Sequence, residues 1–169
     1  TELTPAPVSG VFKDEIPKTK KPLSLPFKTD AETIKREVAR LKAGEEVNVA
    51  SLALGAKVLK ASNEHYGPAT QVISPFMPLN MFDGLESARS RIPGHFEEVT
   101  VALAKPSVLH RLELDFTYFV NNNPREVLIQ GLINGAWKEL VPKTYVKSFA
   151  GNRKTFSLTE AGVVHELRV

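Results

Sequence analysis

The chain has 169 residues, of which 42% are hydrophobic and 24% charged, and its formal net charge is +3. These proportions are typical of one soluble globular domain plus an extension, and so small a charge gives no reason to expect a nucleic-acid partner. The chain has no cysteine, no apolar run near the roughly 20 residues of a membrane span and no signal-peptide pattern, so we expect no disulfide, no thiolate site and no membrane partner, and a cytoplasmic location.

Residues 1–28 are rich in proline and lysine. Repeated proline removes backbone donors and disfavours both helices and central strands. We therefore expect an extended arm or linker here. Its five prolines are Pro5, Pro7, Pro17, Pro22 and Pro26.

Residues 29–46 show the pattern of an amphipathic helix. Thr29 and Glu32 have the spacing of a capping box, and Gly44 suits a left-handed stop at the other end. The apolar residues at helical spacing are Ala31, Ile34, Val38 and Leu41. We assign this helix to packing and not to chemistry.

Beyond Ser51 the period of the apolar residues changes to two. Alternation at 99–103 and 112–116 is typical of half-buried antiparallel strands. Asn134-Gly135, between 127–133 and 136–141, predicts a tight hairpin because both residues tolerate positive φ. Further short strands are expected around Val58, around Val146 and over Val164–Val169. The pattern predicts an all-β antiparallel sandwich or jelly roll, whose last strand either is an edge or continues into a longer protein.

The segment Met81–His95 is a polar loop that could carry chemistry. Asp83, Glu86 and His95 are candidate acid or base groups. Arg89 and Arg91 are two residues apart, so in an extended segment both would point to one side and could grip a carboxylate. Salt bridges within the loop would explain the same composition.

Two other features have a structural and a functional interpretation. Asn121-Asn122-Asn123-Pro124 is typical of a turn, although its amides, Asn122 among them, suit hydrogen bonding to a ureido or sugar ligand. Phe76 and Phe82 could line a site, but we expect them to cover the core.

Known catalytic and metal motifs are missing from the sequence. His65, His95, His110 and His165 fall in no recognised ligand spacing, and neither a Gly-x-Ser-x-Gly elbow nor a phosphate loop occurs. A divalent ion as cofactor is left open, since the sequence names no ligands for one.

Four segments in one order resemble the allantoicase family. They are Gly55–Leu59 with Ala61–Tyr66, the loop Met81–His95, Leu112–Phe119 with Asn122 and Pro124, and Trp137–Pro142. The loop keeps most of the family's polar pattern, in Asp83, Gly84, Glu86, Arg89, Arg91, Pro93, Gly94 and His95. The sequence departs from the family at Asn63, Phe82, Leu85, Ala88 and Asn121, which puts substrate and activity in doubt.

The resemblance implies a galactose-binding-like jelly roll over residues 47–169. Family chains contain two such repeats and form oligomers, so we expect this chain, with about one repeat, to form a homo-oligomer or to pair with a second repeat. No Pro-Asp-Gly-Gly segment follows the last strand as it usually does in the family, so we also expect the chain to be a fragment of a longer protein.

The reaction that the resemblance implies is hydrolysis of allantoate, a small ureide, to ureidoglycolate and urea. In this hypothesis Arg89 and Arg91 hold the substrate carboxylate, Glu86 or His95 moves the proton, and Asp83 orients one of them. Asn122 contributes a further hydrogen bond. The alternatives are a non-catalytic module that binds a sugar or another small ligand, and a half-subunit whose site is completed by another chain.

Overall fold

The computed structural model describes residues 31–169, so the expected arm of residues 1–28 and the capping residue Thr29 lie outside the described residues. Within that range the chain forms an α-helix, three 3-10 turns and seven strands. The helix and turns are α2 (Ala31–Lys42), η1 (Leu52–Leu54), η2 (Ala69–Ile73) and η3 (Met81–Asp83). The strands are β1 (Lys57–Ala61), β2 (Val99–Val108), β3 (Arg111–Asp115), β4 (Glu126–Ile133), β5 (Ala136–Tyr145), β6 (Arg153–Ser157) and β7 (Val163–Arg168).

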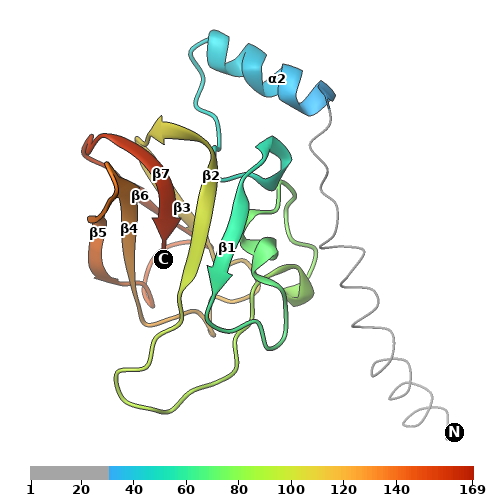
Figure 1. The fold of residues 1–169 in the computed structure, drawn as a ribbon. Coiled ribbons are helices and arrows are strands. Elements are labelled where there is room, and N and C mark those ends of the chain that lie inside the picture. The colour runs from blue at the N-terminus through green and yellow to red at the C-terminus, as the bar shows by residue number, and fades with distance from the viewer. Residues whose placement is uncertain (1–30) are drawn as a thin grey trace, which may run out of the picture.

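Two antiparallel sheets make up the domain (Figure 1). The larger sheet has the strand order β1-β2-β7-β4-β5, and the smaller one pairs β3 with β6. Every pairing is antiparallel. The expected antiparallel β architecture is therefore confirmed. The last strand, β7, lies between β2 and β4 and is not an edge of the sheet.

The β4–β5 hairpin forms as its sequence predicts. Asn134 and Gly135 have φ values of 51° and 75°, the left-handed conformation that a two-residue turn of this kind requires. On β4 the buried positions alternate, with Val127, Ile129 and Ile133 facing inward. The turn and the alternation thus agree on one register, in which Ile133 pairs with Ala136.

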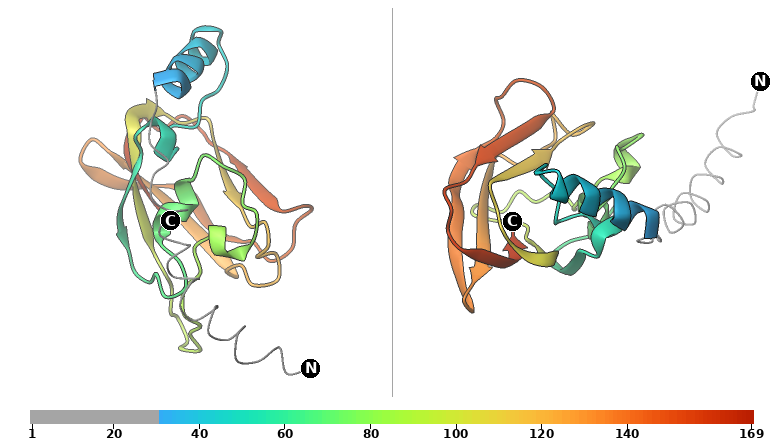
Figure 2. Two further views of the ribbon diagram at one scale, coloured as in Figure 1. Left: turned by 90° about the vertical axis from the view of Figure 1, so that its right-hand side faces the viewer. Right: turned by 90° about the horizontal axis from the view of Figure 1, so that it is seen from above.

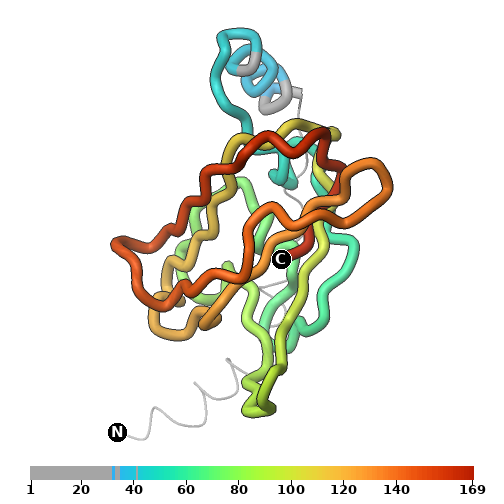
Figure 3. Tube along the Cα trace, turned by 90° about the vertical axis from the view of Figure 1, so that its left-hand side faces the viewer, coloured from blue at the N-terminus to red at the C-terminus, as the bar shows by residue number. Residues whose placement is uncertain are grey.

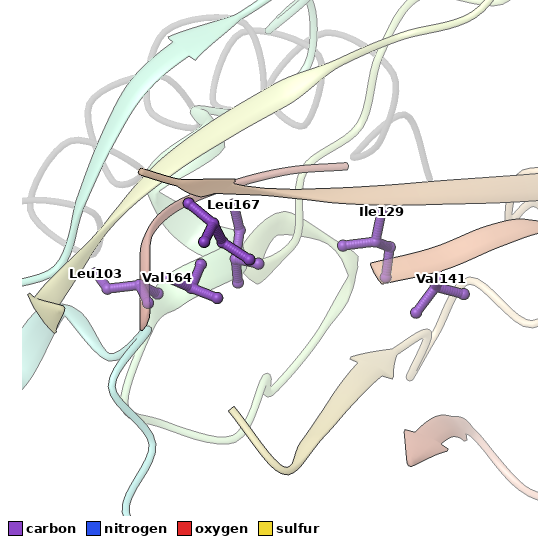
Figure 4. Close-up of a cluster of buried hydrophobic side chains, with 6 residues drawn as sticks. Leu103, Ile129, Val141, Val164 and Leu167 are labelled. Atoms are coloured by element: carbon purple, nitrogen blue, oxygen red, sulfur yellow. The ribbon is translucent and has the colours of Figure 1, made fainter. Parts of the chain in front are cut away.

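The main core lies between the two sheets (Figure 4). Its buried side chains come from four strands of the larger sheet and are Leu103, Ile129, Ile133, Val141, Val164 and Leu167. From the smaller sheet, Leu112 and Leu114 of β3 and Phe156 of β6 pack against them. A second, smaller cluster of Ala56, Ile73 and Val101 lies where η2 covers the β1–β2 side.

The helix α2 lies beyond one end of the strands (Figure 2, left). It continues to Lys42, and Gly44 follows at a φ of +81°, as its position after the helix predicts. Seen from above, the orange and red strands lie on one side of β2 and the teal and green 3-10 turns on the other (Figure 2, right). No helix between residues 31 and 169 has the length and apolar character needed to cross a membrane.

Three local predictions differ from the structure. Phe76 and Phe82 are 63% and 41% exposed, so the expectation that they cover the core is wrong. No separate strand forms around Val146, because β5 itself runs to Tyr145. The strand β6 was not predicted, since Phe156 is its only large apolar residue and the others are polar or charged.

Candidate functional site

The polar loop lies at the end of the sandwich opposite α2 (Figures 1 and 3), where it appears in yellow-green. After η3 the chain forms no further helix or strand until Val99, where β2 begins. We call residues 81–98 the end loop. None of its residues is buried, although Met81, the six residues from Asp83 to Ala88, Glu97 and Glu98 are only partly exposed. Apolar burial therefore does not fix its shape.

Hydrogen bonds from the segment after β1 hold the first half of the end loop. The Tyr66 amide donates to the Glu86 carbonyl at 2.9 Å. The Ala88 amide donates to Asn63 Oδ1 at 3.2 Å, and Gln71 Nε2 donates to the Phe82 carbonyl at 3.0 Å. Gln71 is itself buried, so this contact anchors the loop to the packed part of the domain.

The second half of the end loop forms a hydrogen-bond network with side chains that follow β1. His95 Nε2 lies 2.7 Å from Glu97 Oε1. The Ser62 hydroxyl donates to Glu97 Oε2, and Asn63 Nδ2 donates to Oε1 at 3.3 Å. Ser62 Oγ also accepts the Glu98 amide at 2.7 Å. This network thus joins the end of β1 to the start of β2.

These contacts make the Glu97 carboxylate the most perturbed acid in the site. The Ser62 hydrogen bond is the largest cause of a lowered Glu97 pKa, and the hydrogen bond and positive charge of His95 act in the same direction. Partial burial opposes them, but the net shift is downward. Glu97 is therefore ionised at neutral pH.

Two of the predicted acid or base groups, Asp83 and Glu86, have different surroundings. Asp83 Oδ2 accepts the Leu79 amide at 2.8 Å, so this carboxylate closes the turn around η3. Glu86 is half-buried, and its carboxylate forms no hydrogen bond or ion pair within residues 31–169. The contact that orients His95 comes from Glu97 and not from Asp83. The catalytic roles of Asp83 and Glu86 stay predictions.

The two predicted anion-binding side chains, Arg89 and Arg91, are exposed. Neither takes part in an ion pair or hydrogen bond between residues 31 and 169, in contrast to Arg40, Arg111 and Arg153. Salt bridges of these two arginines to acidic side chains of the loop, the alternative explanation of its composition, do not form in the described part of the chain. Two guanidinium groups are thus available to an anion.

The asparagine turn follows Phe119, whose ring reaches Gly84 of the end loop. The Asn122 amide donates to the Phe119 carbonyl at 2.9 Å, and a Cβ added to Gly84 would come within 2.6 Å of Phe119 Cε2. Asn122 is exposed, as a ligand contact would require. Its neighbour Asn123 is buried and donates from Nδ2 to the Val146 carbonyl at 2.6 Å. The structure therefore brings Phe119, just before this turn, to Gly84 of the end loop.

Ser62 and Glu97 are two site residues that were not predicted from the sequence. Glu97 lies two residues from His95, and residues at that spacing in an extended segment point to the same side. That signal was available in the sequence. Ser62 comes from another strand end, 35 residues away, and only the fold brings it to Glu97.

No arrangement of three or more His, Asp or Glu side chains suitable for a metal occurs within residues 31–169. The described residues therefore supply no ligand set for a divalent ion. We derive no chemical step through a metal.

Comparison with known proteins places this domain in a family. The family model named allantoicase repeat matches residues 47–169, well over half of the chain. The chain belongs to the allantoicase family. A probable allantoicase of Burkholderia mallei (strain ATCC 23344) is 40% identical over 95 residues, which are 56% of this chain and 28% of that relative. The match thus spans less than a third of the relative's length.

Solved structures confirm the jelly-roll fold. Allantoicase from Saccharomyces cerevisiae superposes with a TM-score of 0.66 at 26% identity, over 72% of this chain and 38% of that one. The family 32 carbohydrate-binding module from Streptococcus pneumoniae EndoD has a TM-score of 0.55 at 16% identity, over 72% of this chain and 83% of the module. At that identity the second likeness concerns the fold alone.

Proposed function

We propose that the end loop hydrolyses allantoate to ureidoglycolate and urea. The observation that carries the proposal is the pair of exposed arginines, Arg89 and Arg91, which lack an acidic partner within residues 31–169 and lie on the same loop as a hydrogen-bonded imidazole. Membership of the allantoicase family supplies the reaction. The chain spans less than half the length of the relatives it matches, so the site could need a second repeat or a second copy to complete it.

In this proposal Arg89 and Arg91 bind the substrate. A carboxylate accepts two parallel N–H bonds from a guanidinium, and such charge-assisted bonds are stronger than neutral ones. Holding the carboxylate of allantoate fixes the adjacent carbon, which bears both ureido groups, relative to the loop. Asn122, on the neighbouring turn, would add a hydrogen bond to a ureido oxygen.

The chemical step requires one proton to leave water and one to reach the departing nitrogen. Water attacks the carbon that bears the ureido groups while Glu86 or His95 takes its proton. The carbon–nitrogen bond breaks, and the same proton can then be returned to that nitrogen, which leaves as urea. An elimination-like route, with the second ureido nitrogen expelling urea before water adds, needs the same two proton transfers.

The test is urea release from allantoate by the purified full chain, measured with and without manganese. We expect His95→Ala to lower kcat by about 100-fold or more, as is typical of a lost acid or base group. Arg89→Ala and Arg91→Ala should each raise KM about 10- to 100-fold, the effect of losing one charge-assisted contact.

The matched control is Arg36→Ala. Arg36 is an exposed arginine on α2, at the opposite end of the sandwich, and its removal should leave both constants unchanged. If the folded wild-type chain released no urea, alone or after association into oligomers, the reaction assignment would be wrong. A non-catalytic jelly roll that binds a small ligand would then be the better explanation.

A further inference from the structure

We infer that Glu97 is the positioning residue for His95: its carboxylate holds the imidazole by Nε2 and leaves Nδ1 to act as the base. This inference rests on the proposed function and assigns to His95, in preference to Glu86, the proton transfer from water. It also gives a role to Ser62 and Asn63, which hold the carboxylate in place.

The donor and acceptor roles follow from the atoms in contact. An ionised carboxylate can only accept hydrogen bonds, so His95 Nε2, 2.7 Å from Glu97 Oε1, must carry the proton. The lone pair of the neutral ring is then on Nδ1. No hydrogen bond to Nδ1 forms within residues 31–169, and the His95 side chain is 38% exposed, so a substrate or water can reach the ring.

Glu97 is itself held at both oxygens. Ser62 donates to Oε2, and Asn63 Nδ2 reaches Oε1 at 3.3 Å. The Ser62 amide donates a hydrogen bond to the Glu98 carbonyl at 2.9 Å, which fixes the Ser62 backbone. The carboxylate is therefore attached to the end of β1 and the start of β2, where these two strands pair, and not only to the loop. This is the support that a positioned catalytic group requires.

A turn in the loop backbone places His95 next to the Glu97 carboxylate. The His95 amide donates to the Ile92 carbonyl at 3.1 Å, which closes a turn, and Gly94 in that turn has a φ of +76°. Few residues other than glycine adopt such a φ without strain. The turn reverses the chain just before His95, so the ring can meet the side chain two residues further on.

The charges around the pair favour an imidazole partner. Within residues 31–169, Glu97 forms no ion pair with a lysine or arginine, so His95 is the one basic side chain that contacts its carboxylate. The adjacent carboxylate, Glu98, lies 3.9 Å from Arg168 Nε and is directed to that arginine. Arg168 in turn donates to Gln130 and lies over the ring of Trp137. The two neighbouring glutamates therefore serve different partners.

This difference provides a matched pair of variants. Glu97→Gln and Glu98→Gln each remove one negative charge at adjacent positions and keep the size of the side chain. Only the first removes the carboxylate that accepts the His95 proton. We expect Glu97→Gln to lower kcat about tenfold or more with KM unchanged within twofold, because substrate binding depends on the arginines. Glu98→Gln should leave both constants unchanged.

An NMR spectrum separates positioning from mere folding of the loop. Glu97→Gln removes the carboxylate that accepts the His95 Nε2 proton, so the ring C–H signals of His95 should shift relative to the wild type. Those of His165, on β7, should not shift.

The NMR spectrum also separates this inference from the proposed function. If the wild-type chain fails to release urea but the His95 signals respond to Glu97→Gln, the reaction is wrong and the pairing stands as a polar site for another substrate. Unchanged His95 ring signals, or equal kcat in the Glu97→Gln and Glu98→Gln variants of an active enzyme, would overturn the inference.

Discussion

The β4–β5 hairpin and the end loop acquire their shapes in different ways. In the hairpin, alternate residues are buried and the two-residue turn fixes the register. In the end loop no residue is buried, and its course is set by side chains such as Asn63 and Gln71 that bond its backbone. The hairpin therefore depends on volume and apolar area, whereas the loop depends on individual donors and acceptors.

The largest loss of stability should come from a substitution in the hairpin. Ile129 is fully buried in the main core, so Ile129→Ala should lower the free energy of unfolding by about 2 to 4 kcal/mol. Leu128→Ala, at a neighbouring position that is 37% exposed, should cost less than about 1 kcal/mol. Urea unfolding measures both. Equal costs would contradict the inward orientation of Ile129.

A steric change where Gly84 of the end loop meets Phe119 should cause the second-largest loss of stability. Gly84 has a φ of −114°, which alanine adopts freely, so the cost of Gly84→Ala comes from the 2.6 Å approach to Phe119. We expect a loss of about 1 to 3 kcal/mol from overpacking.

The double variant Gly84→Ala with Phe119→Leu tests that cause. A smaller side chain at 119 should recover part of the loss, which a double-mutant cycle measures as a favourable coupling. Strictly additive costs would show that the two residues do not touch.

Loss of a polar contact to the end loop should have a smaller, pH-dependent effect on stability. Ser62→Ala removes the hydrogen bond that most lowers the Glu97 pKa and should cost about 1 kcal/mol near neutral pH. Because folding lowers this pKa, the contribution of Glu97 to stability is present above its ordinary value of 4.5 and is lost as the pH falls through the lower, folded value.

The difference in unfolding free energy between Ser62→Ala and the wild type should therefore shrink below about pH 4.5. Urea unfolding at neutral pH and at about pH 3 would show this. A difference that stays constant would mean that the serine stabilises the loop through the Glu98 amide alone.

The smallest loss of stability should come from a substitution in the helix α2. Arg40 pairs with Glu45 at 2.8 Å and with Glu37 at 3.2 Å, and its side chain is 46% exposed. Exposed ion pairs contribute little, so Arg40→Ala should change the free energy of unfolding by less than about 0.5 kcal/mol. A loss above 1 kcal/mol would show that this end of the molecule is also held by single polar contacts.

The same contrast explains what the sequence could predict. The segments 127–133 and 136–141 on either side of the Asn134-Gly135 turn specify a hairpin through local rules, and the structure forms it. Phe76 and Phe82 were expected in the core on hydrophobicity alone, which fails in a segment without periodicity. The pairing of Glu97 with Ser62 depends on the β1–β2 register and cannot be obtained from sequence spacing. The roles assigned to Asp83, Glu86, Arg89, Arg91 and Asn122 stay predictions.

The central position of β7 has a consequence for how the chain folds during synthesis. The β1–β2 and β4–β5 pairs meet in one sheet only through β7, which bonds β2 on one side and β4 on the other. Residue 100 pairs with residue 168, so the sheet must wait for almost the whole domain to leave the ribosome. Such long-range pairing slows folding, and until then two unpaired strand edges are exposed to other chains.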